Sequence, residues 1–276
     1  MEGGGFPVRR PFPVRTLSHV DPFLLLDEMG PVEWKPGEAI GAPDHPHRGF
    51  EAVTYLLDGQ IVHEDSAGHK GQLGPGDVQW MTAGSGVIHS EMPDPHFQEA
   101  GGLMHGFQIW VNLPARDKMM KPRYQEVSSQ TIPEGKSGDG KASVRVIAGR
   151  SKLGGSAVID TRTPIMYLHY LIQGGGQVEE VIPRDYGSLV YVFKGEARIG
   201  TDSTVVRSGQ MAILGDGESV QISVENNTSE SAEMLILGGV PLKESVARYG
   251  PFVMNTEEEI QQAVQDYQNG VFTSNS

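Results

Sequence analysis

The sequence of 276 residues contains no cysteine. This absence excludes disulfide bonds, thiolate metal ligands and cysteine nucleophiles. Metal chemistry in this chain must therefore rest on histidines and carboxylates. Eight of the nine histidines lie between His19 and His105, and His169 alone lies beyond them. We therefore expect a metal site in the first half of the chain and a second half without metal.

Basic residues are also few, with 22 Lys and Arg against 35 Asp and Glu, which gives a formal net charge of -13. This balance opposes nonspecific binding to a phosphate backbone, which needs clustered cations. The sequence has no apolar run of 18 residues, and its first residues lack the pattern of a secretory signal. We expect a cytoplasmic monomer that binds neither nucleic acid nor membranes.

The length favours two domains, which we place at residues 1–130 and 131–276 with a polar connection between residues 114 and 143. The 36 glycines, 18 prolines and short runs of Val, Ile, Leu and Tyr predict an all-β fold with tight turns. A strand that runs into a hairpin at residues 51–62 has a counterpart at residues 188–200. The two halves therefore resemble diverged copies of one β-unit, the second without the histidines.

Two residue pairs carry the strongest chemical signal. His45 and His47 are spaced i, i+2, and so are His89 and Glu91. In a β-strand this spacing puts both side chains on one face, so two neighbouring strands would direct three imidazoles and one carboxylate at one point. A single surface histidine arises by chance, but two such pairs in glycine-rich contexts predict a metal site. These donors suit Fe, Mn, Ni, Co, Zn or Cu and leave room for substrate.

Other residues allow more than one interpretation. Arg48, directly after His47, either pairs with a carboxylate that stiffens the site or attracts an anionic substrate. His63 and His69 flank a turn-rich hairpin, and we expect both to be solvated rather than to line a pocket. Near the C-terminus, a capping box beginning at Thr256 and an apolar stripe at i, i+3, i+4, i+7 predict an amphipathic helix that packs on a barrel.

With these features the chain resembles the pirins, which belong to the bicupin branch of the cupin superfamily. The resemblance covers nearly the whole length, and its most specific segments are residues 44–51, 76–84, 88–93 and 250–256. It implies two jelly-roll-like β-barrels in tandem and one non-haem iron in the first. The implied ligands are His45, His47, His89 and Glu91, and the implied metal is Fe(II), with Mn, Ni, Co, Cu or Zn as other candidates.

A second carboxylate competes with Glu91. The broader cupin pattern expects its carboxylate ligand shortly after His-x-His, where Glu51 stands. On a regular strand Glu51 lies roughly 13 Å along the backbone from His47, and Glu91 lies about half that distance from His89. The resemblance to pirins also favours Glu91. Glu51 would then accept a hydrogen bond from an imidazole or face solvent.

Three functions remain open. The first, which the resemblance to pirins implies, is a quercetin 2,3-dioxygenase-type oxidoreductase that opens a flavonol or related enol with O2, with Glu91 as a catalytic base. The second is a metal- and redox-dependent regulatory protein that binds a protein partner. The third is a metal-stabilised structural domain. The enzyme predicts O2 turnover with reduced iron. The regulatory protein predicts partner binding that depends on the oxidation state of the metal. The structural domain predicts that chelation lowers the melting temperature and removes no activity.

Overall fold

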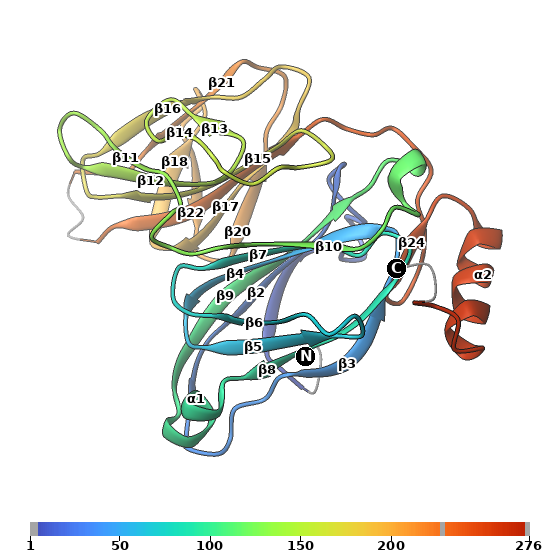
Figure 1. The fold of residues 1–276 in the computed structure, drawn as a ribbon. Helices are drawn as coiled ribbons and strands as arrows, with labels where there is room; N and C mark the ends of the chain where they lie inside the picture. The colour runs from blue at the N-terminus through green and yellow to red at the C-terminus, as the bar shows by residue number, and fades with distance from the viewer. Residues whose placement is uncertain (1–4, 227–229, 274–276) are drawn as a thin grey trace. The chain divides into compact units, whose positions relative to one another are not determined.

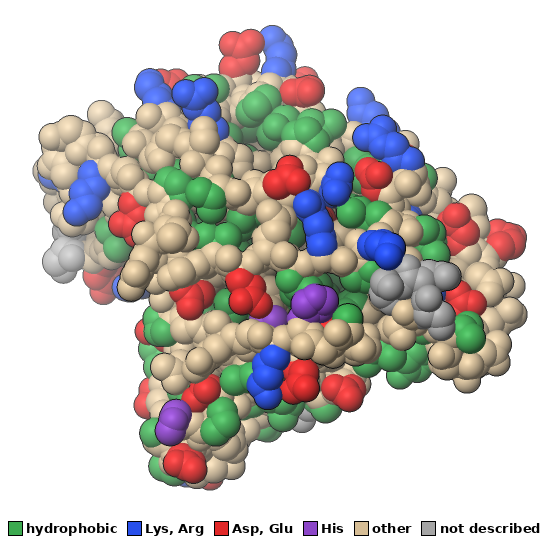
Figure 2. All heavy atoms as spheres, viewed as in Figure 1, with side chains coloured by type: hydrophobic (Ala, Val, Ile, Leu, Met, Phe, Trp, Pro, Cys, Tyr) green, Lys and Arg blue, Asp and Glu red, His purple; other side chains and the backbone are tan. Residues whose placement is uncertain are grey.

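The computed structural model describes residues 5–226 and 230–273, and strands dominate it (Figure 1). The chain divides into two compact units. The first contains residues 5–19, Phe23–Ser129 and residues 242–273, and the second contains Val20–Pro22 and Gln130–Pro241. No helix among the described residues is long and apolar enough to cross a membrane. On the face drawn in Figure 2, acidic and basic side chains lie side by side rather than in separate patches.

The first unit is built from two antiparallel sheets. One has the strand order β1-β2-β9-β4-β7-β10 and the other the order β3-β8-β5-β6. The larger sheet comprises β1 (Val8–Phe12), β2 (Phe23–Trp34), β9 (Gly102–Asn112), β4 (Phe50–Asp58), β7 (Val78–Thr82) and β10 (Arg123–Val127). The smaller sheet comprises β3 (Ala42–His47), β8 (Val87–Pro93), β5 (Ile61–Asp65) and β6 (Lys70–Leu73).

The second unit repeats this plan. Its sheets have the orders β11-β12-β15-β22-β17-β20 and β16-β21-β18-β19. Their strands are β11 (Glu134–Lys136), β12 (Ala142–Ala148), β15 (Ile165–Ile172), β22 (Ala232–Gly239), β17 (Gly187–Lys194), β20 (Gln210–Ile213), β16 (Gln177–Val181), β21 (Ser219–Ser223), β18 (Glu196–Ile199) and β19 (Thr204–Arg207). A short hairpin, β13 (Arg150–Ser151) and β14 (Gly155–Ser156), completes the unit. The matching strand orders confirm the predicted duplication.

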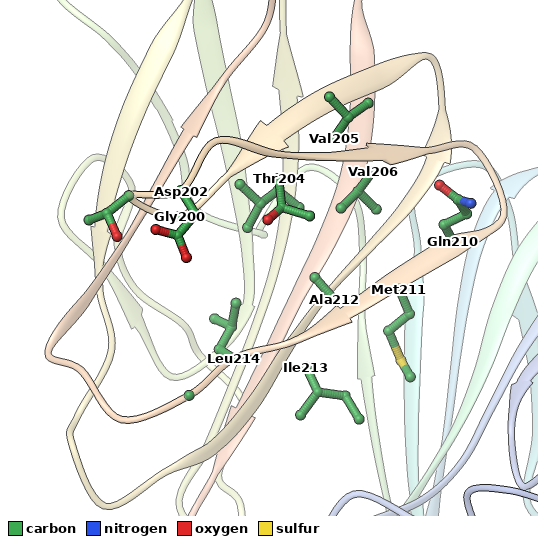
Figure 3. A pocket seen from close by; sticks show the side chains of 13 residues that line it. Gly200, Asp202, Thr204, Val205, Val206, Gln210, Met211, Ala212, Ile213 and Leu214 are labelled. Atoms are coloured by element: carbon green, nitrogen blue, oxygen red, sulfur yellow. The ribbon is translucent and has the colours of Figure 1, made fainter.

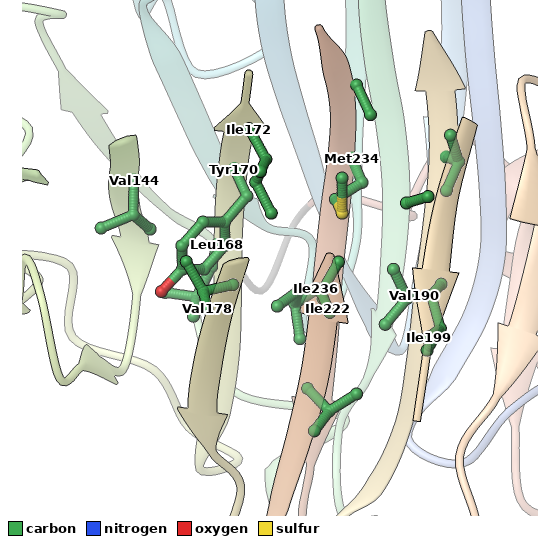
Figure 4. Packing of buried hydrophobic residues seen from close by; sticks show 14 of the residues in the cluster. Val144, Leu168, Tyr170, Ile172, Val178, Val190, Ile199, Ile222, Met234 and Ile236 are labelled. Carbon is green, nitrogen blue, oxygen red and sulfur yellow. The ribbon is translucent and has the colours of Figure 1, made fainter. Parts of the chain in front are cut away.

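The core of the second unit lies between its two sheets. Val144, Leu168 and Ile236 from the larger sheet and Val178 and Ile222 from the smaller sheet belong to one buried cluster (Figure 4). Alternate residues along each strand face this layer, which is the pattern of a sheet with one face buried. The all-β prediction is confirmed.

The C-terminal residues join the first unit. They form the hairpin β23 (Ala247–Tyr249) and β24 (Phe252–Met254), followed by α2 (Glu257–Gln268). The capping box at Thr256 is present as predicted. Two shorter helices, α1 (Pro95–Ala100) and the 3-10 turn η1 (Ala115–Asp117), also belong to the first unit.

The placement of this segment differs from the expected domain limits, which put residues 131–276 together. Ile260 and Ala263 of α2 form an apolar cluster with Phe252 and Phe272, and Ile88 of β8 packs against that cluster. Burial of these side chains against β8 and β24 favours association of residues 242–273 with the first unit rather than the second.

Candidate metal centre

Three imidazoles meet on the inner face of the smaller sheet of the first unit. His45 of β3 lies directly opposite His89 of β8 in the strand register, and His47 follows two residues after His45. One ring nitrogen from each histidine lies within 4.8 Å of those of the other two. The ring centroids are 4.4 Å apart for His45 and His89 and 5.1 Å apart for His47 and His89. The i, i+2 spacing thus brings the three predicted histidines together.

Burial keeps two of these imidazoles neutral. His47 is 4% exposed and His89 is 1% exposed. Burial, followed by the nearby His89 and His45, holds the pKa of His47 well below its ordinary value of 6.5. Burial lowers the pKa of His89 to about 4, although the Glu91 charge opposes that shift. A neutral imidazole has a free lone pair at neutral pH, and this is the form that binds a metal ion.

The hydrogen bonds of the rings leave nitrogen atoms available. His45 Nδ1 lies 2.8 Å from the carbonyl oxygen of Pro43. A carbonyl can only accept, so Nδ1 carries the proton and Nε2 offers its lone pair. Both ring nitrogens of His89 and Nδ1 of His47 are buried, and no hydrogen bond to a described residue satisfies them. Unsatisfied buried nitrogens at the meeting point of three rings fit a metal ion.

Aromatic side chains hold the His47 ring. Trp110 and Phe50 lie edge-on to it, with centroid distances of 5.2 and 5.1 Å. Phe50 and Trp110 also stack on each other at 4.2 Å, and the guanidinium of Arg248 lies 4.7 Å from the Trp110 ring centre. These contacts restrict rotation of the imidazole and exclude water from one side of the site.

Glu91 lies on the same strand as His89, but the group of three ring nitrogens does not include it. Its Oε1 accepts a hydrogen bond of 2.8 Å from Thr54 Oγ1 of β4. It lines the same cavity as His45 and His47. The structure therefore places the carboxylate beside the imidazoles and holds one of its oxygens on the opposite sheet.

Glu51, the competing carboxylate, is fully buried on β4. Its Oε1 accepts a hydrogen bond of 2.6 Å from Thr82 Oγ1 of the neighbouring β7. Its interpretation as a solvent-facing residue is therefore wrong. The group of candidate ligands found among residues 5–226 and 230–273 does not contain it.

The connection after His47 is fixed by buried polar contacts. The Arg48 guanidinium is buried, donates 2.6 Å to the Ser85 carbonyl and pairs with Asp266 at 2.7 Å. Of the two interpretations of Arg48, the structure supports the carboxylate pair. Gly49 has φ +88°, and a Cβ there would lie 1.9 Å from the Val253 carbonyl oxygen, so this turn requires glycine.

The two histidines of the hairpin behave differently. His69 has a side chain that is 61% exposed and pairs with Asp65, in agreement with the expected solvated position. His63 is fully buried, and its Nε2 lies 2.6 Å from Glu126 Oε1, so the expectation of a solvated His63 is wrong. The alternation of buried residues along β5 would have pointed to this, because Ile61, His63 and Asp65 share one face.

A cavity of about 580 Å³ in the first unit is lined by His45, His47 and Glu91. Its walls are largely apolar, with Leu25, Met29, Leu56, Met104 and Trp110 among them.

The polar groups of the cavity include Thr54 and Gln108, the ion pair of Arg10 with Asp27, and Arg248. The volume and the mixture of apolar walls with a few convergent polar groups are typical of a small-molecule site. The sequence patterns do not point to Arg10, Thr54, Gln108 or Arg248.

The second unit has different chemistry at the equivalent strands. Val178 and Glu180 of β16 and Val220 and Ile222 of β21 occupy the inner face there. Glu180 accepts hydrogen bonds from Ser151 and Tyr170 and is buried. A separate depression of about 730 Å³ lies beside β19 and β20 and is lined by residues such as Val206, Ala212, Ile213 and Leu214 (Figure 3). The imidazole site therefore belongs to the first unit.

Comparison with known proteins agrees with this duplicated architecture. The family described as Pirin matches residues 5–111, and the Pirin C-terminal cupin domain matches residues 167–273. The chain is 46% identical to a pirin-like protein of Solanum lycopersicum, over 98% of this chain and 88% of that protein. It is 45% identical to human pirin, over 97% of this chain and 88% of that protein.

A solved structure is similar over the same length. The crystal structure of a quercetin 2,3-dioxygenase from Acinetobacter baumannii superposes with a TM-score of 0.92 and 37% identity, and covers 99% of this chain and 93% of its own. The two tandem units are accordingly cupin domains. The extent of these matches shows that the chain belongs to the pirin family.

Proposed function

We propose that the first unit binds one divalent metal ion, with iron as the working metal, and uses it to oxidise a flavonol-like enol with O2. The observation that carries this proposal is the group of three imidazoles whose ring nitrogens lie within 4.8 Å of one another, two of which, His45 and His47, line the cavity. His45, His47 and His89 would hold the ion through ring nitrogens, and Glu91 would add a carboxylate oxygen. Nitrogen and oxygen donors of this kind suit iron, and four protein ligands leave positions open.

When bound, the ion would supply Lewis acidity toward an enolic hydroxyl and redox chemistry with O2. The protein residues would supply the remaining requirements. Glu91 would accept the proton of the hydroxyl on its carboxylate, because it lies beside the imidazoles and faces the cavity. Thr54 would hold Oε1 by its hydrogen bond, so the proton would go to Oε2, the same oxygen that would otherwise bind the ion.

The cavity supports a flat aromatic substrate. Leu25, Leu56, Met104 and Trp110 give it apolar walls that exclude water from the reacting atoms. Arg248 places a positive charge at the same wall, which would favour an enolate over the neutral enol. The similar structure from A. baumannii is that of a quercetin 2,3-dioxygenase, and quercetin is therefore the first substrate to test.

The test is O2 uptake with quercetin after anaerobic loading with Fe(II), compared between the wild type and Glu91→Gln. We expect metal-dependent uptake in the wild type and a loss of at least 100-fold in the variant, as for removal of a general base. Glu126→Gln is the matched control, because Glu126 is bonded to His63 rather than located in the cavity. Full activity in Glu91→Gln would exclude Glu91 as the base. Bound metal without uptake in the wild type would favour the regulatory function.

A further inference from the structure

Thr54 forms a hydrogen bond that connects the two sheets of the first unit beside the imidazoles. It lies on β4, is 2% exposed and lines the cavity. Its hydroxyl Oγ1 is 2.8 Å from Glu91 Oε1 on β8 and 2.6 Å from Oε1 of the Gln108 side-chain amide on β9. Gln108 is the residue directly opposite Thr54 in the strand register. The three side chains thus form a continuous hydrogen-bonded row that ends at Glu91.

The donor and the acceptor of each hydrogen bond in this row follow from the protons that the groups carry. A hydroxyl carries one proton, so Thr54 cannot donate to Glu91 and to an oxygen of Gln108 together. An ionised carboxylate only accepts, so Thr54 donates to Glu91. In the structure Gln108 Oε1 faces Thr54 Oγ1. A turn of the amide by about 180°, which keeps its shape, places Nε2 there instead, so that Nε2 donates to Thr54 Oγ1. Each donor polarises the next group, and this strengthens the bond to the carboxylate.

We propose that Thr54, supported by Gln108, is a positioning residue that occupies one oxygen of Glu91 and leaves the other oxygen to face the metal. This inference rests on the proposed metal site. It explains why Glu91 accepts a bond from the opposite sheet instead of joining the imidazole group. A carboxylate bound through one oxygen adds a single donor to the three imidazoles, so positions remain open for small molecules.

The neighbouring residues make this role specific to Thr54. His63 lies opposite Glu91 on β5, but its Nε2 is already bonded to Glu126. Arg10, a cation that lines the same cavity, forms a two-point contact with Asp27 at 2.6 and 2.5 Å. Thr54 therefore supplies the hydrogen bond that the described residues offer to Glu91.

The experiment uses Co(II) as the probe, because its visible absorption reports the number and geometry of its ligands. The full-length metal-free chain is titrated as the wild type, Thr54→Val, Thr54→Ser and Thr82→Val. Valine keeps the shape of threonine without its hydroxyl, and serine keeps the hydroxyl. Thr82→Val is the matched control, because it removes an equivalent buried bond from threonine to Glu51.

We expect Thr54→Val to raise the Kd for Co(II) roughly ten-fold and to change the absorption spectrum, as removal of a partner that orients a ligand typically does. Thr54→Ser and Thr82→Val should match the wild type in both measurements. In a Glu91→Ala background, Thr54→Val should cause no further change, because the partner on which it acts is missing. A similar loss in both backgrounds, or a wild-type spectrum and Kd in Thr54→Val, would overturn the inference.

The outcomes also separate this inference from the proposed function. A wild-type chain that does not bind Co(II) would contradict the metal site and the role of Thr54 together. Wild-type binding that is unchanged in Glu91→Ala would keep a three-imidazole site but would remove both Glu91 as a ligand and Thr54 as its positioning residue.

Discussion

Arg48 and Asp266 form an ion pair of 2.7 Å between residues that are 218 positions apart in the sequence. Arg48 directly follows His47, and Asp266 lies on α2. The backbone of Arg48 is also bridged to β24, since its carbonyl accepts from Val253 N at 3.1 Å. The C-terminal segment of the first unit therefore anchors the strand that carries two of the three imidazoles.

Loss of the charge on Asp266 should weaken this anchor. Asp266→Asn leaves the buried Arg48 without a charged partner, and we expect the free energy of unfolding to fall by roughly 2 kcal/mol. Urea denaturation followed by tryptophan fluorescence measures this, because Trp34, Trp80 and Trp110 all lie in the first unit. Glu258→Gln, an exposed change on the same helix, is the control. Equal effects of the two substitutions would contradict a specific anchor.

A buried lysine also binds the backbone around Gly49 and Val253. Lys118 is 1% exposed, and its Nζ donates to the Gly49 carbonyl, to Asn112 Oδ1 and to the Val253 carbonyl. Lys118→Met keeps the length of the side chain but leaves these acceptors unsatisfied. We expect a loss of about 3 kcal/mol in the same urea experiment. Lys121→Met, an exposed substitution nearby, should be close to neutral. A stable Lys118→Met protein would show that the three contacts are dispensable.

The buried imidazoles make the metal-free protein sensitive to acid. In the unfolded chain a histidine takes up a proton below about pH 6.5, whereas His89 in the folded protein does so only near pH 4. Stability from His89 is therefore complete above pH 6.5 and is lost as the pH falls toward 4. We expect a loss on the order of 2 kcal/mol between pH 7 and pH 5 from this residue.

Urea denaturation of the metal-free chain at these two pH values measures the loss. The variant His89→Gln has no titrating group at this position, so its stability should depend less on pH over the same range. The same pH dependence in the wild type and in His89→Gln would contradict a buried, neutral His89.

Much of the candidate site was predictable because it depends on strand periodicity. Residues at i, i+2 share a face, so the histidine pairs needed only the antiparallel register of β3 and β8 to meet. The all-β fold and the helix near the C-terminus likewise follow from local patterns. The capping box of Thr256 and Glu259 identifies the start of α2 without tertiary information.

The remaining features depend on contacts between distant residues. Sequence alone does not show that α2 packs beside Ile88, or that Arg48 finds its partner 218 residues away. The partner of the buried His63, Glu126, lies on a strand 63 residues later. Thr54 and Gln108 become a pair only through the register of β4 with β9.

The most direct test of the account is the metal content of the purified chain after anaerobic loading with Fe(II) and removal of free metal. The wild type should retain one ion per chain. His89→Ala should lose it, because His89 offers a buried ring nitrogen to the group of three. His69→Ala, which changes an exposed histidine outside this group, should retain the ion. Equal metal content in His89→Ala and the wild type would contradict the proposed centre.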